Sequence, residues 1–133
     1  WSRGKKCKPV TAPFDVTLFK DGKENIVQPD IVVVCDPENV DERGRYTGVP
    51  TLVVEVLSAA TRNKDMLKKL DLYMAGGVGE YWIVNPENRE IYIYKFADGR
   101  LRNTCGSGHT PGTGFCGGGE KRGRSSFRIS VEV

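Results

Sequence analysis

The chain is poor in histidine, with only His109 among its 133 residues. A histidine-activated nucleophile is not expected at Ser58 or Thr61, because no histidine lies near either residue in the sequence. We expect these two residues to cap a helix instead. The four cysteines, at positions 7, 35, 105 and 116, include no Cys-x-x-Cys pair. No apolar run approaches the roughly 20 residues that a membrane span needs, so no membrane association is expected.

An excess of charge of one sign is also missing. The chain has 20 basic and 17 acidic residues and a net charge of +3, which permits a nucleic-acid partner without indicating one. Its length suits a single domain with one core, and we expect that domain to cover residues 1–133. Cys35 ends an apolar run and is predicted to be a small buried hydrophobic residue. Reduced cysteines and a cytoplasmic location are the expectation.

Hydrophobic patterning predicts a mixed α/β (α+β) domain. The runs typical of strands are 14–19, 31–35, 51–57, 80–84, 90–96 and 127–133. A helix is predicted from Ser58 or Thr61 to about Ala75, ended by Gly76-Gly77. The apolar face predicted for this helix consists of Met66, Leu67, Leu70, Tyr73 and Met74. The order of strand 51–57, helix and strand 80–84 is a βαβ-like unit.

The segment 104–126 departs from this pattern. Eight of the 20 residues from Cys105 to Arg124 are glycine, and such a segment buries too little apolar surface to offset the entropy of ordering it. Two interpretations stay open, a long flexible loop and a stretch read out of frame. A zinc site made by Cys105, His109 and Cys116 is a further alternative, although its spacing matches no common zinc finger.

A glutamate interrupts the most apolar strand, in the run Thr51-Leu52-Val53-Val54-Glu55-Val56-Leu57. Leaving its carboxylate buried and unpaired would cost on the order of several kcal/mol. Asp30 lies at the start of the neighbouring apolar run, 31–35. Two acids at the edges of adjacent strands, followed by a lysine-bearing helix, indicate a divalent-metal site for phosphate chemistry. The structural alternatives are a pairing of Glu55 with Lys64, Lys69 or a backbone donor, and a turn role for Asp30.

The order of these residues resembles a known family. The matching residues are Gln28-Pro29-Asp30-Ile31, Val54-Glu55-Val56-Leu57-Ser58, then Thr61, Asp65, Lys69 and Tyr73, and finally Gly77-Val78 and Glu80-Tyr81-Trp82. Over residues 13–96 the chain is similar to the Uma-type family of restriction endonucleases, which belongs to the PD-(D/E)xK nuclease superfamily. The resemblance implies a restriction-endonuclease-like mixed central β-sheet flanked by helices. It also implies that this chain lacks the N-terminal part of the family's domain.

The resemblance assigns roles by position. Asp30 matches the first metal-binding acid and Glu55 the second. Leu57 stands where the superfamily usually has its lysine, and Lys69 of the following helix aligns best as a replacement, with Lys64 next.

Two further residues complete the expected site. The backbone carbonyl of Val56 is expected as a third ligand for Mg²⁺ or Mn²⁺. Gln28 lies two residues before Asp30, so strand alternation predicts that both face the same side of the sheet. We expect Gln28, and also Lys64 at the start of the helix, to contact substrate.

The implied activity is metal-dependent cleavage of DNA by a possible homodimer. The alternative is a catalytically inactive relic of the fold that binds nucleic acid or protein. Leu57 and the short N-terminal part favour that alternative.

Overall fold

The computed structural model describes residues 6–58, 64–87, 89–102 and 127–130, with the backbone alone at Lys64 and at 127–130. It contains a seven-stranded sheet of order β1-β4-β5-β6-β7-β8, in which β9 also pairs with β7. The strands are β1 (Lys8–Thr11), β4 (Ile31–Val34), β5 (Leu52–Val56), β6 (Glu80–Asn85), β7 (Glu90–Ala97), β8 (Arg100–Arg102) and β9 (Phe127–Ser130). The β5–β6 pair is parallel, and the other pairs are antiparallel. The predicted mixed central sheet is confirmed.

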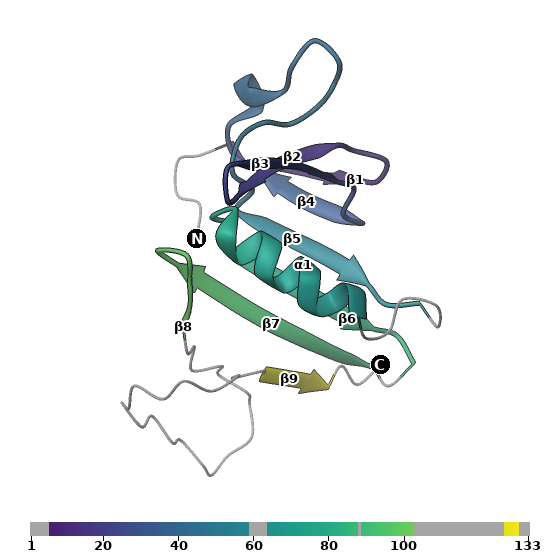
Figure 1. Ribbon diagram of the computed structural model, residues 1–133. Helices are drawn as coiled ribbons and strands as arrows, with labels where there is room; N and C mark the ends of the chain where they lie inside the picture. The colour runs from purple at the N-terminus through teal and green to yellow at the C-terminus, as the bar shows by residue number, and fades with distance from the viewer. Residues whose placement is uncertain (1–5, 59–63, 88, 103–126, 131–133) are drawn as a thin grey trace.

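A single helix, α1 (Lys64–Ala75), connects the two parallel strands. The predicted βαβ unit is therefore present, and α1 runs along one face of the sheet (Figure 1). The helix ends where the sequence predicted, with Gly77 at φ 81° and the Val78 N–H donating to the Tyr73 carbonyl at 3.1 Å. No helix within the described ranges is long and apolar enough to cross a membrane.

A β-hairpin packs beside the N-terminal half of the sheet. It is formed by β2 (Val16–Lys20) and β3 (Lys23–Val27), joined at Asp21-Gly22. Both turn residues have positive φ, 51° and 72°, as a two-residue hairpin turn requires. An ion pair between Lys20 and Asp71 connects β2 to α1. A short 3₁₀ helix, η1 (Pro37–Asn39), follows β4.

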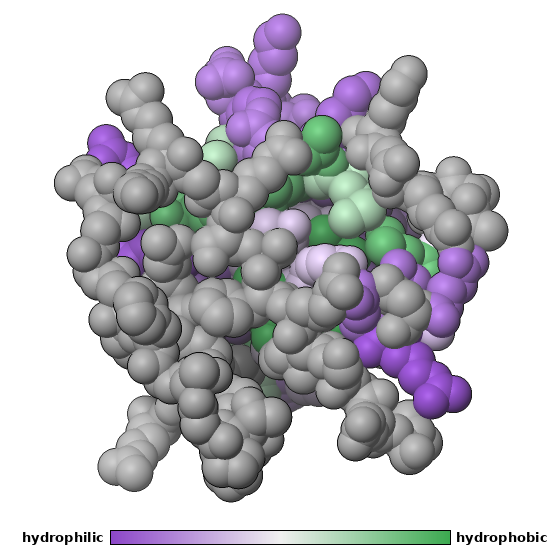
Figure 2. Space-filling view, turned by 90° about the horizontal axis from the view of Figure 1, so that it is seen from below, coloured by the Kyte–Doolittle hydropathy of each residue, from purple (hydrophilic) through white to green (hydrophobic). Residues whose placement is uncertain are grey.

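The core lies between α1, the hairpin and the sheet. Its fully buried members include Val16, Val32, Val53, Tyr73, Val78, Tyr81 and Ile83. Strand alternation sends the neighbouring residues Val33, Leu52 and Val54 to the opposite face, where they form a second, smaller cluster. Seen from below, apolar residues gather toward the middle of the visible face and hydrophilic ones stand at its margins (Figure 2).

The predicted apolar face of α1 is correct except at one position. Tyr73 is fully buried, and Met66, Leu70 and Met74 pack against the core. Leu67 is 51% exposed, because it lies about 120° around the helix from Tyr73 at 3.6 residues per turn.

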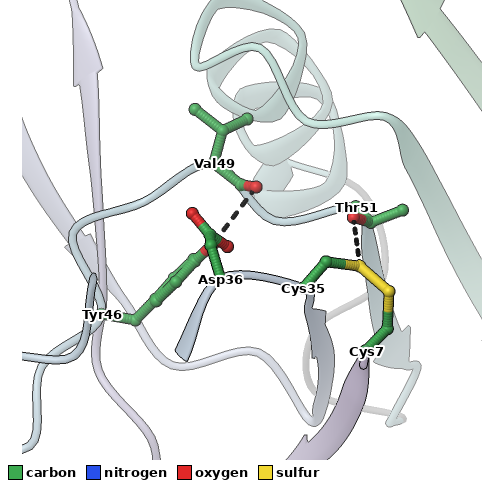
Figure 3. The surroundings of a disulfide bond; sticks show 6 residues. All are labelled: Cys7, Cys35, Asp36, Tyr46, Val49 and Thr51. Carbon is green, nitrogen blue, oxygen red and sulfur yellow. Dashed lines mark hydrogen bonds between the residues drawn. A yellow bond between two sulfur atoms is a disulfide. The ribbon is translucent and has the colours of Figure 1, made fainter. Parts of the chain in front are cut away.

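The expectation of reduced cysteines is wrong for one pair, since Cys7 and Cys35 form a disulfide (Figure 3). The antiparallel register pairs Lys8 with Val34, and its continuation by one residue brings the two cysteines opposite each other. Cys35 is half-buried rather than part of the core, and its sulfur lies 3.1 Å from the Thr51 hydroxyl. The candidate zinc residues Cys105, His109 and Cys116, and the whole segment 104–126, lie outside the described residues.

Candidate active site

The two predicted acids lie side by side across the β4–β5 pair. Ile31 pairs with Val54, so the same register continued by one residue sets Asp30 opposite Glu55. Asp30 accepts a hydrogen bond at its Oδ2 from the backbone N–H of Val56 at 2.7 Å. Both carboxylates line one cavity of about 340 Å³. Asp30 is exposed whereas Glu55 is 8% exposed. The cavity is therefore lined by one solvated and one buried carboxylate.

Two side chains of α1 compensate the buried charge of Glu55. The Lys69 Nζ donates to Glu55 Oε1 at 3.0 Å, and the Tyr73 hydroxyl donates to the same oxygen at 2.7 Å. The ion pair that the sequence left open as an alternative is therefore present. It brings the helix lysine into the cavity with both acids, and Leu57 also lines this cavity.

The same helix face continues to Asp65. Its carboxylate lies 3.6 Å from the Lys69 Nζ, so Lys69 bridges an exposed acid on its own helix and the buried acid on β5. The residues at positions 65, 69 and 73 follow the four-residue spacing that places side chains on one face of a helix. This spacing is the signal in the sequence that connects Tyr73, which belongs to both the predicted apolar face and the family pattern, to the candidate site.

Gln28 lines the same cavity as Asp30 and Glu55. Its side-chain amide donates to Asp15 Oδ1 at 2.6 Å, so Asp15 orients the predicted substrate-binding residue at the cavity edge. Lys64 is the first residue of α1, and its side chain lies outside the described part of the structure.

The backbone of Val56 faces Asp30. Leu57 donates its N–H to the Val84 carbonyl of β6 at 2.8 Å, whereas Val56 donates to Asp30 on the other side of β5. In a strand the N–H and the C=O of one residue point to the same side. The Val56 carbonyl therefore faces the Asp30 side of β5, and its role as a third ligand stays a prediction.

The donor set suits a hard divalent cation, because carboxylate and carbonyl oxygens are the ligands that Mg²⁺ and Mn²⁺ prefer. Among the described residues, the hydrogen bonds to Glu55 are made through Oε1 and the bond to Asp30 through Oδ2, which leaves Oε2 and Oδ1 for a ligand. No group of three or more histidine, cysteine or acidic side chains able to hold a metal occurs in the described ranges. A bound ion would therefore need the backbone carbonyl and water besides the two acids.

Burial raises the pKa values of the tyrosines around Glu55. Desolvation in the core, followed by the charge of Glu55, raises the pKa of Tyr73 well above its ordinary value. The same two causes raise the pKa of Tyr81, whose ring lies 4.7 Å from that of Tyr73. Both hydroxyls therefore stay protonated at neutral and moderately alkaline pH.

The fold is similar to that of a solved protein structure. A crystal structure described as "a putative nuclease belonging to DUF820 from Anabaena variabilis" matches with a TM-score of 0.54 and 18% identity, over 68% of this chain and 51% of that one. This likeness shows a shared fold, and our chain spans about half of that protein.

The curated relatives are of a different kind. The carbamoyl phosphate synthase large chains of Mycobacterium tuberculosis and Mycobacterium bovis are 28% identical over 87 residues, which is 60% of this chain but 7% of theirs. So small a share carries nothing of that enzyme's activity.

The family comparison covers most of the chain. The family model Uma2, described as "Putative restriction endonuclease", matches residues 1–110. This confirms the family that the motifs at Asp30, Glu55 and Lys69 resemble. The chain belongs to the Uma2 family of restriction-endonuclease-like proteins.

Proposed function

We propose that this chain is a metal-dependent endonuclease that hydrolyses DNA phosphodiester bonds. The observation that carries the proposal is the meeting of Asp30, which directly precedes β4, Glu55 of β5 and Lys69 of α1 in one cavity. The family and the nuclease-like fold support it.

Asp30 and Glu55 would hold Mg²⁺ or Mn²⁺ through their carboxylate oxygens, together with the Val56 carbonyl. When bound, such an ion lowers the pKa of a coordinated water and neutralises charge on the phosphate. Asp30 is exposed, so it is the side of the pair that an incoming hydrated ion meets first.

Lys69 would serve the reacting phosphate. Its side chain is 29% exposed and lies at the cavity, so its ammonium can orient the attacking water or stabilise charge that develops on the phosphate oxygens. The Gln28 amide and the Lys64 ammonium would contact the DNA backbone near the cleaved bond. We propose a cytoplasmic protein and, for cutting both strands, a homodimer.

A catalytically inactive relic that binds nucleic acid or protein is the second candidate. One observation favours it: Leu57 occupies the position of the superfamily's usual lysine. The ion pair of Lys69 with Glu55 would then serve the stability of the fold alone.

The test is the incubation of the folded protein with supercoiled plasmid in Mg²⁺, in Mn²⁺ and in EDTA. The endonuclease proposal predicts nicked or linear DNA in at least one metal and intact plasmid in EDTA. Intact plasmid in every condition would reject it. Retardation of labelled DNA by the same preparation would then identify the binding relic.

A further inference from the structure

Two donors of different character hold the same oxygen of Glu55. Tyr73 is fully buried, and its hydroxyl lies 2.7 Å from Oε1. Lys69 lies 3.0 Å from that oxygen, but its side chain is 29% exposed. The tyrosine is fixed in the core, whereas the lysine stands at the cavity.

We infer that Tyr73 is a positioning residue of the proposed nuclease site. It holds Glu55 through Oε1, which turns Oε2 toward the cavity, and it lets Lys69 leave Glu55 for the substrate without freeing the carboxylate. The inference rests on the proposed function and deepens it.

The packing of the Tyr73 side chain supports this role. Its ring packs against that of Tyr81 at 4.7 Å between centroids and 55° between planes, and the helix backbone fixes the position of its Cα. A side chain that does not bind the metal itself can fix the orientation of a metal-binding carboxylate by donating a hydrogen bond to it. The packing of its ring holds Tyr73 in place for this role.

Lys69 has an alternative partner that makes its release feasible. An ammonium has three N–H donors, and Asp65 lies 3.6 Å from the Lys69 Nζ on the exposed side. When Lys69 turns toward a phosphate, Asp65 remains within reach and Tyr73 still compensates Glu55. A buried carboxylate that relied on Lys69 alone would lose its only donor at that step.

The test compares Tyr73→Phe with a matched control, Tyr92→Phe. Tyr92 also donates its hydroxyl to a buried glutamate, Glu90, at 2.7 Å, but neither residue lines the cavity. Mn²⁺ binding to each intact protein is measured by calorimetry, and plasmid cleavage is measured as a function of Mn²⁺ concentration. Tyr73→Phe should weaken Mn²⁺ binding about tenfold or more, the range for a lost outer-shell partner, and saturating Mn²⁺ should restore much of the cleavage rate. Tyr92→Phe should change neither.

The possible results separate the inference from the function beneath it. Tyr73→Phe with unchanged Mn²⁺ affinity in a protein that cuts DNA overturns the inference and leaves the nuclease proposal standing. Equal losses in both variants overturn it as well, because they indicate a general effect of deleting a buried hydroxyl. A wild-type protein that neither binds Mn²⁺ nor cuts overturns the proposed function, and the inference falls with it.

A second measurement covers the case in which Tyr73→Phe does not fold. The hydroxyl proton of Tyr73 in the wild-type protein is followed by NMR while Mg²⁺ is added. The inference predicts a hydroxyl resonance protected from exchange with water before and after Mg²⁺ binds. Loss of this protection on addition of Mg²⁺ would contradict it.

Discussion

The Lys69 Nζ lies 3.0 Å from Glu55 Oε1, although the two residues are 14 positions apart and belong to α1 and β5. The parallel β5–α1–β6 crossover brings the helix across the end of β5 that carries the acid. A helix lysine thus lines the cavity that Leu57 also lines, and Leu57 is the position where the resembled pattern would have a lysine on the strand.

Lys69→Met should lower the rate of metal-dependent plasmid cleavage by about 100-fold, the cost of removing one preorganised donor from a reacting oxygen. Mn²⁺ binding should persist, because Asp30, Glu55 and the Val56 carbonyl are unchanged. The control is Lys68→Met, which removes an exposed lysine from the same helix. Single-turnover cleavage with excess protein measures both. An equal loss of cleavage rate in Lys68→Met would contradict a specific role for Lys69, because it would indicate a general effect of removing a positive charge from the helix.

Asp30→Asn should weaken Mn²⁺ binding by more than the roughly tenfold loss typical of an outer-shell partner. The change leaves an acceptor for the Val56 N–H, so the free energy of unfolding should stay close to that of the wild type. Asp36→Asn is the control, since Asp36 accepts from Tyr46 away from the cavity. Calorimetric titration with Mn²⁺ measures the affinity of both variants. Undiminished binding by Asp30→Asn would remove it from the ligand set.

Replacing Cys7 and Cys35 by serine should lower the free energy of unfolding by about 3.5 kcal/mol, the loop-closure contribution of a disulfide between residues 28 positions apart. Urea unfolding with and without dithiothreitol measures the difference. Dithiothreitol should destabilise the wild type and leave the double variant unchanged. Sensitivity of both proteins to the reductant, or of neither, would contradict the bond.

The same reduction should leave DNA cleavage unchanged under conditions in which the protein stays folded. Cys7 and Cys35 lie at one end of the β1–β4 pair, whereas Asp30 lies at the other, where its carbonyl accepts from the Ala12 N–H at 3.0 Å. The disulfide and the acids therefore occupy opposite ends of β4. Cleavage assays with and without dithiothreitol test this, and a reductant-dependent rate would show that the two ends are coupled.

Alkaline pH should destabilise the fold once it exceeds the ordinary tyrosine pKa of 10.0. Burial raises the pKa values of Tyr46, Tyr73 and Tyr81 in the folded state, so above that pH the unfolded chain loses protons that the folded chain keeps. Stability is therefore unaffected by these groups below pH 10 and falls as the pH rises beyond it. Urea unfolding between pH 8 and 11 checks this, and Tyr73→Phe should reduce the slope.

The sequence predicted the elements with strong apolar patterning. The strands around Val33, Val54 and Ile83 and the end of the helix at Gly76-Gly77 are confirmed, because hydrophobic runs and a glycine stop are local signals. It missed β1, β3 and β8. These are short strands with many exposed residues, and they are strands because a partner pairs with them rather than because of their own composition.

The candidate site was predictable in part. The sequence singled out Glu55, Asp30 and Lys69, because a charge inside an apolar strand is a local anomaly and the family pattern supplied the lysine. The roles of Asp15 and Tyr73 were not predicted, since both depend on contacts across elements. The Cys7–Cys35 disulfide was missed for the same reason, because it follows from the β1–β4 register.

The most direct measurement is plasmid cleavage by Glu55→Gln beside its matched control, Glu90→Gln. Both changes neutralise a buried glutamate that accepts from a tyrosine 2.7 Å away, but only Glu55 lines the cavity with Asp30 and Lys69. We expect Glu55→Gln to abolish Mg²⁺- or Mn²⁺-dependent nicking and Glu90→Gln to retain it. Nicking by Glu55→Gln at the wild-type rate would contradict the two-acid site.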